Sequence, residues 1–186
     1  DLVLTLSNGA TIVIAVGQTS GSVTIAAPSD DVYVDSSTLT VSITGTSGSN
    51  FNQINSGSTT TTTITDTVDT TTVTLSAPAS VNEGGTITYT ASVGSAPQTD
   101  LVLTLSNGAS ITIAAGSLSG SVTVDAPGED VYQDSGSLTV SITGSSGGNY
   151  EALDTSSSAT TTVSDTVDIT TVTLSSATAG QTVTEG

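Results

Sequence analysis

The chain of 186 residues contains no lysine, arginine or histidine, but it has 17 aspartate and glutamate residues. The net charge of −17 excludes nucleic-acid binding through a basic patch, because neutralising phosphates requires Lys or Arg. The same absence argues against docking on anionic lipid. No carboxylate can form a salt bridge with another side chain, so each acid is either solvated or neutralised by a cation from outside. The uncompensated repulsion is a first reason to expect a metal ion.

Cysteine, methionine and tryptophan are also absent, and the aromatic residues are four Tyr and one Phe. Without Cys, no disulfide can stabilise the fold. Together with the acidic, Gly-, Ser- and Thr-rich composition, this indicates an extracellular bacterial protein. No apolar run is long enough to span a membrane, so we expect no membrane insertion by this segment. The core must come mostly from Val, Ile, Leu and Ala, which predicts a thin margin of stability for a domain of about 100 residues.

Catalysis has few candidate groups in this chain. General acid–base chemistry usually uses His, or a carboxylate or Lys with a shifted pKa, and a nucleophilic Ser needs an activating base. Only a pair of carboxylates remains, and nothing in the sequence places one in a pocket. The sequence therefore predicts a protein that is not an enzyme. The absence of Trp argues in the same way against a carbohydrate-binding module.

An internal repeat is the most informative feature that is present. Residues 1–76 laid over residues 100–175 are identical at 50 positions. A period of 99 residues is too long for a solenoid turn and fits a small domain. A series of nearly identical domains suits a function that increases with the number of domains, such as reach, spacing or multivalent binding.

The repeat frame divides the chain into three parts. We expect a repeat lacking its first strands at 1–69, a complete repeat at 70–168, and the first strand of a third repeat at 169–186. This division predicts that the chain is a segment of a much longer polypeptide. No Gly/Ser-rich or Pro-rich spacer separates the repeats, so we expect short junctions that limit bending.

Alternating apolar and polar residues, dominated by Val, Ile and Thr, run through the complete repeat and are typical of half-buried strands. The predicted strands lie at 71–76, 86–93, 101–106, 109–114, 121–125, 137–143 and 159–166. Between two of them, Asn107 and Gly108 predict a hairpin with a type I′ turn, which needs positive φ at both central residues. Short strands at this spacing predict an all-β fold of tandem immunoglobulin-like β-sandwich domains in an extended array.

Acidic residues recur at equivalent places in the repeats. Asp31 and Asp35 match Asp130 and Asp134, Asp66 and Asp69 match Asp165 and Asp168, and Glu83 matches Glu185. Loops at one end of a sandwich lie together, so we expect Glu83, the 130–134 loop and the 165–168 junction to converge. Calcium takes six to eight oxygen ligands. The set therefore predicts structural Ca²⁺ that stiffens the joint between repeats.

The alternative is that the acids are solvated surface charges that keep an extracellular array soluble. We assign Asp1, Asp100, Asp125, Glu151 and Asp154 to this role. Tyr33 and Tyr132 are expected to pack their rings under the neighbouring loops.

The order of motifs also resembles a known family. The segments are VTLSAPASVNEGGTITYTASV, DLVLTLSNGASITIAAGSLSGSVTV, DVYQDSGSLTVSITG and TTTVSDTVD. Together they resemble the immunoglobulin-like repeats of giant bacterial RTX adhesins, the Lap-type biofilm adhesins in particular, and also the Calx-β module.

The resemblance implies a bacterial cell-surface protein exported by a type I system. Its repeats would form an extender that holds a distal binding domain away from the cell, with the neighbouring repeats as partners. It also implies calcium at Glu83, Asp130, Asp134, Asp165 and Asp168. The Calx-β acidic loop is usually richer in Glu and Asp than the 130–134 loop, which implies a weaker site, or one completed by carbonyls and water.

A second hypothesis is a self-assembling extracellular filament or matrix subunit. In it, partial repeats complete each other by strand exchange between copies. A first repeat without its initial strands could accept them from the C-terminus of a neighbour. A giant native polypeptide would support the extender, and a subunit near 18.1 kDa would support the filament.

Overall fold

A computed structural model describes residues 1–35, 38–133, 135–177 and 179–186. Within these ranges the regular elements are all β-strands, which confirms the predicted all-β class. None of the described residues forms a helix long and apolar enough to cross a membrane. The chain divides into two compact units. Unit 1 comprises Asp1–Thr71 with Asn149–Leu153, and unit 2 comprises Thr72–Gly148 with Asp154–Gly186.

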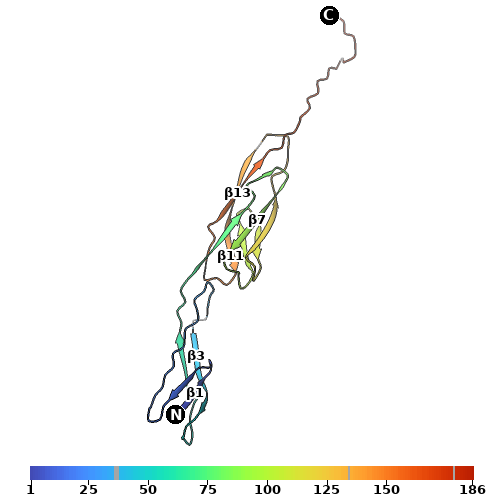
Figure 1. The fold of residues 1–186 in the computed structure, drawn as a ribbon. Coiled ribbons are helices and arrows are strands. Elements are labelled where there is room, and N and C mark those ends of the chain that lie inside the picture. Colours follow the sequence, from blue (N-terminus) through green and yellow to red (C-terminus); the bar gives the residue numbers. More distant parts are fainter. Residues whose placement is uncertain (36–37, 134, 178) are drawn as a thin grey trace. The chain divides into compact units, whose positions relative to one another are not determined.

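Two sheets make the complete repeat a β-sandwich (Figure 1). The first sheet has the order β10-β7-β5-β12 and the second the order β6-β13-β11-β8-β9. The strands are β5 (Thr70–Ser76), β6 (Ser80–Asn82), β7 (Thr86–Val93), β8 (Leu101–Leu105), β9 (Ser110–Ile113), β10 (Ser119–Asp125), β11 (Gly136–Gly147), β12 (Ala152–Asp154) and β13 (Ser158–Ser164). All seven predicted strands are present. The structure adds β6 and β12, which are too short for an alternating pattern to be visible.

The core of unit 2 follows from the period-two pattern. In β5, Val73 and Leu75 are buried while Thr74 between them is exposed. In β8, Leu101, Leu103 and Leu105 are almost completely buried. Burying a side chain of this size contributes about 1.5–3 kcal/mol. Together these alternating strands supply an aliphatic core that needs neither Trp nor a disulfide.

The hairpin between β8 and β9 is present as predicted, but the predicted turn type is wrong. Gly108 has a φ of 84°, whereas Asn107 does not adopt positive φ. The Gly108 amide donates to the Leu105 carbonyl at 2.9 Å, and the Leu105 amide donates to the Ala109 carbonyl at 2.9 Å. This pattern is a type I turn closed by a glycine bulge, which needs positive φ at only one residue.

Unit 1 contains one sheet among its described residues, in the order β2-β1-β3-β4. Its strands are β1 (Leu2–Leu6), β2 (Thr11–Ile14), β3 (Thr38–Ser47) and β4 (Thr59–Thr63). Ninety-nine residues later, the corresponding residues form β8, β9, β11 and β13. Unit 1 therefore reproduces one sheet of the sandwich, and its apolar side chains are less well covered. Leu4, for example, is partly exposed, whereas its counterpart Leu103 is fully buried.

Candidate metal site

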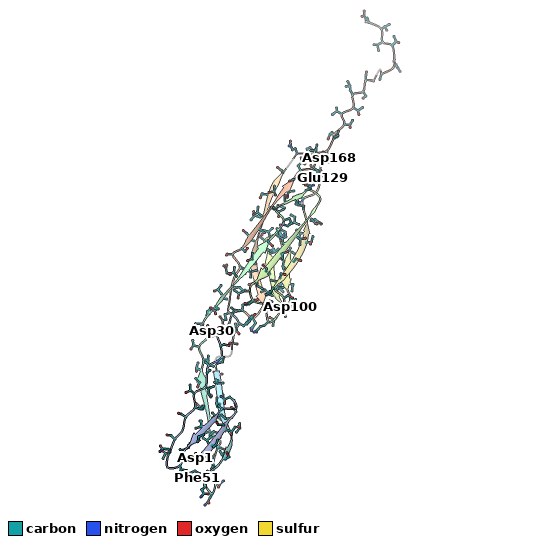
Figure 2. The ribbon with its side chains drawn as sticks, in the orientation of Figure 1. Asp1, Asp30, Phe51, Asp100, Glu129 and Asp168 are labelled. Atoms are coloured by element: carbon teal, nitrogen blue, oxygen red, sulfur yellow. The ribbon has the colours of Figure 1, made fainter. Side chains whose placement is uncertain are left out.

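Three carboxylates meet at one end of unit 2. Oxygen atoms of Glu83, Glu129 and Asp165 all lie within 4.8 Å of one another. Glu83 is buried, Asp165 is partly buried and Glu129 is exposed, so the cluster opens to solvent on one side. Figure 2 shows Glu129 at this end of the unit and Asp100 at the opposite end.

Backbone hydrogen bonds hold together the three chain segments to which these acids belong. Glu83 follows β6, and its amide donates to the carbonyl of Ser164, the last residue of β13, at 3.1 Å. Gly84 has a φ of 68° and donates its amide to the Pro127 carbonyl at 2.7 Å. A left-handed residue of this kind is tolerated best as glycine. The turn thereby places Glu83 beside the loop that carries Glu129. It also places Glu83 beside the end of β13, where Asp165 is the next residue.

The donor set fits a hard divalent cation. Calcium binds oxygen ligands at about 2.3–2.6 Å, so oxygen atoms around one ion lie within about 5 Å of each other. The Oδ1 atom of Asp165 is buried and accepts no hydrogen bond in the described structure. A buried ionised carboxylate is costly unless a counter-charge neutralises it, and no side chain of this chain is cationic. The three carboxylates are therefore candidate ligands for a calcium ion.

The cluster contains two of the predicted ligands, Glu83 and Asp165. The predicted ligands Asp130 and Asp168 are exposed and lie outside this group. The Oδ1 atom of Asp130 instead accepts the Tyr132 amide at 2.7 Å. The predicted ligand Asp134 lies outside the described residues.

Sequence reasoning did not select Glu129. A signal was available in the repeat, because its counterpart 99 residues earlier, Asp30, is also an acid. Asp30 and Glu129 each stand one residue before the acids that were selected, Asp31 and Asp130.

The acids of the first repeat adopt several environments. The Oδ1 atom of Asp31 accepts the Tyr33 amide at 2.8 Å, as Asp130 does for Tyr132. Asp35 and Asp66 line one cavity together with Asp30, whose carboxylate accepts the Thr67 hydroxyl at 2.8 Å. The remaining predicted ligand, Glu185, is exposed in the C-terminal segment.

Glu151 lies beside Asp66 and Asp69 in unit 1, so its assignment as a solvated surface acid is wrong. The Asp69 amide donates to Glu151 Oε2, while the Oε1 atom is buried without a hydrogen-bond partner. The bond from Asp69 lowers the pKa of the Glu151 carboxyl. This lowering is outweighed by three effects that raise the pKa of Glu151. They are desolvation, a side-chain hydrogen bond with Asp66 and the charges of both aspartates. Neighbouring like charges disfavour ionisation in this way.

The two tyrosines of the acidic loops differ from each other. The Tyr33 ring stacks on the Tyr150 ring with centroids 5.5 Å apart. Tyr132 is 73% exposed, so the prediction that it packs under its loop is wrong. Tyr132 is therefore available to solvent in unit 2.

These features define an all-β protein of repeated units with an acidic cluster suited to a structural cation. The family model of the LapA domain matches residues 1–67 and again residues 69–166. The chain belongs to the LapA domain family, that of the Lap-type biofilm adhesins, which are structural, non-enzymatic proteins of the cell surface. A comparison with curated proteins finds no match. The resemblance to Lap-type adhesins is confirmed, whereas the immunoglobulin-like and Calx-β repeat type stays a prediction.

Proposed function

We propose that this chain is part of the structural extender of a large bacterial cell-surface adhesin, exported by a type I system. The observation that carries the proposal is the pair of consecutive LapA matches, which leave only residue 68 between them. Repeats joined without a spacer add length with each copy and leave little slack for bending. The neighbouring repeats of the same chain are the partners of each unit.

Calcium rigidifies this extender in our proposal. Glu83, Glu129 and Asp165 would hold the ion, supported by their convergence within 4.8 Å and by the absence of cationic side chains. An ion at this place joins the turn after β6 to the residue that follows β13. It would fix the start of the segment that follows β13 and offset the repulsion between the three acids.

Thermal unfolding of the chain in millimolar calcium and in excess chelator tests the site. An ion that binds only the native state stabilises it by about 2.7 kcal/mol at a hundredfold excess over Kd. For a unit of this size, that corresponds to a rise in Tm on the order of 10 °C. We expect the Asp165→Asn and Glu83→Gln variants to lose most of this rise.

Asp168→Asn is the matched control, because it removes the same charge from an exposed residue outside the cluster. It should retain the full calcium effect. Sodium chloride at the same ionic strength separates general screening from specific binding. A Tm that calcium does not raise beyond the sodium control, or an equal loss in Asp165→Asn and Asp168→Asn, would contradict the proposed site.

A further inference from the structure

Unit 1 contains a segment that the sequence places in the second repeat. Residues 149–153 follow β11 and lie well inside the complete repeat, yet they belong to unit 1. The chain therefore leaves unit 2 after Gly148, contributes five residues to unit 1 and returns to unit 2 at Asp154. A part of the second repeat is thus built into the unit formed by the first.

Main-chain hydrogen bonds join this segment to the acidic loop of the first repeat. The Val34 amide donates to the Asn149 carbonyl at 3.1 Å. The Glu151 amide donates to the Val32 carbonyl at 3.2 Å. The residues between these two bonds form an isolated antiparallel bridge. The segment is therefore held by the main chain, in the manner of a very short added strand.

Side chains strengthen the same contact. The residues at the centre of the bridge are Tyr33 and Tyr150, and their rings stack with centroids 5.5 Å apart and planes inclined by 27°. Tyr150 is only 9% exposed. The Asp69 amide donates to Glu151 Oε2 beside the stack. An aromatic pair in this geometry stabilises a contact beyond the area that it buries.

The loop has its shape independently of this contact. The Oδ1 atom of Asp31 accepts the Tyr33 amide at 2.8 Å, and in the counterpart loop the Oδ1 atom of Asp130 accepts the Tyr132 amide at 2.7 Å. Tyr132 is 73% exposed, so the second loop adopts the same turn around an exposed ring. The loop is therefore preformed, which lowers the entropic cost of binding a segment.

The segment, in contrast, has an unusual backbone. Gly147, Gly148 and Asn149 have φ values of 80°, 86° and 60° in succession. Asn149 is the one residue other than glycine with positive φ among the described residues. Such a conformation is uncommon and persists where the surrounding structure holds it. The bond from Val34 to the Asn149 carbonyl supplies such a restraint.

We propose that the loop at residues 31–34 is the docking site for residues 149–151 of the repeat that follows it in the chain. We name this pairing the interlock. Because the second repeat supplies one half of the interlock, the stability of unit 1 depends on the second repeat. The two halves are joined by main-chain bonds and a ring stack, neither of which requires a metal ion.

The sequence contains both halves of the interlock in each repeat. The loop at 130–133 is the counterpart of 31–34, and residues 50–52, with an aromatic residue at the centre, are the counterpart of 149–151. In a linear array, stability then depends on contacts between nearest neighbours. The role of the interlock in an extender rests on the proposed function, whereas the contact itself does not.

Amide hydrogen exchange of the full 186-residue chain, resolved by residue with NMR in excess chelator, tests the interlock. We expect the Val34 and Glu151 amides to be protected in the wild type. Tyr150→Ala removes one ring and should lower their protection, and that of the β3 and β4 amides in unit 1, by about twofold to tenfold. The β8 amides of unit 2 should keep the protection that they have in the wild type.

Tyr33→Ala removes the other ring and should have the same effect. The double variant should lose little more than either single variant, because the two rings act as a pair. Tyr132→Ala is the matched control, since it removes the same side chain from the counterpart loop, where the ring is exposed. It should leave the exchange of Val34 and Glu151 unchanged.

Free exchange of the Val34 and Glu151 amides in the wild type would overturn the interlock. An equal loss of protection in Tyr33→Ala and Tyr132→Ala would do the same. A loss in Tyr150→Ala that spares β3 and β4 would overturn the dependence of unit 1 on the second repeat. Calcium is absent throughout, so a failure of the calcium-dependent rise in Tm would contradict the proposed calcium site and leave the interlock standing.

Discussion

At the scale of single residues, the two repeats offer a natural comparison of charged and neutral turns. Asp154 Oδ1 accepts the Ser156 amide at 3.0 Å, and its counterpart Asn55 accepts the Gly57 amide at 3.1 Å. The Ser156 hydroxyl, and then its amide, lower the pKa of the Asp154 carboxyl by hydrogen bonding to the ionised form. The acid therefore adds stability to the turn through its charge, and asparagine retains the amide bond alone.

The Asp154→Asn variant should have a lower Tm than the wild type at neutral pH. Because the folded-state pKa of Asp154 is depressed, its contribution is present above the ordinary carboxyl pKa, near 4, and is lost as the pH falls through the folded-state value. The difference in Tm should shrink as the pH falls through the folded-state pKa of Asp154 and disappear below it. Asp168→Asn controls for the reduction in net charge. A difference in Tm that stays constant across this pH range would contradict the assignment.

At the scale of elements, strands of the same sequence are buried to different extents in the two sheets and therefore contribute differently to stability. Leu103 in β8 is fully buried under the opposite sheet, whereas Leu4, its counterpart in β1, is partly exposed. Removing a buried leucine costs about 2–5 kcal/mol, because it leaves a cavity in addition to the lost transfer free energy. The cost falls when the site is already open to water.

We therefore expect Leu103→Ala to destabilise unit 2 by about 2–5 kcal/mol and Leu4→Ala to destabilise unit 1 by less. Amide hydrogen exchange resolved by residue measures both effects in the same chain, since exchange from the core reports the free energy of unfolding. Equal losses of protection in the two units would contradict the difference in covering. Such a result would mean that the β1 sheet is as well covered in solution as the β8 sheet.

The strands of the complete repeat could be predicted from sequence because the alternation of apolar and polar residues is local. Whether an alternating segment forms a strand is not local. Residues 20–26 and β10 have nearly the same sequence, but only β10 has a partner, β7, to accept its hydrogen bonds. Strand propensity is largely a measure of packing against neighbours, so it cannot identify the neighbours. The three-residue strands β6 and β12 depend entirely on their partners.

The candidate site was predicted in outline and missed in detail for a related reason. Glu83 and Asp165 stand directly after β6 and β13, and the pairing of these strands fixes their positions. The acidic loop has no period, so the sequence could not distinguish Glu129 from Asp130. The Asn-Gly hairpin was ambiguous in the same way, since Gly108 fits both a type I′ turn and a glycine bulge.

At the scale of the whole molecule, composition and repetition favour an extender over an enzyme. A net charge of −17 without any cationic side chain opposes self-association through general attraction. Contact between copies therefore needs a specific surface or a divalent ion. Consecutive LapA matches are consistent with length gained within one polypeptide, whereas a filament would gain length by the assembly of separate subunits. A covalent array of repeats and an assembly of separate subunits predict native chains of different mass.

The mass of the native polypeptide decides between these two routes. We expect an antibody raised against residues 1–186 to detect, in the denatured surface fraction of the source cells, a band far above 18.1 kDa. The physical reason is that an extender gains reach by covalent repetition, and denaturation leaves peptide bonds intact while it separates added strands. Denaturation in chelator removes any assembly that calcium holds together. A band near 18.1 kDa would contradict the extender and support the alternative, a filament or matrix subunit.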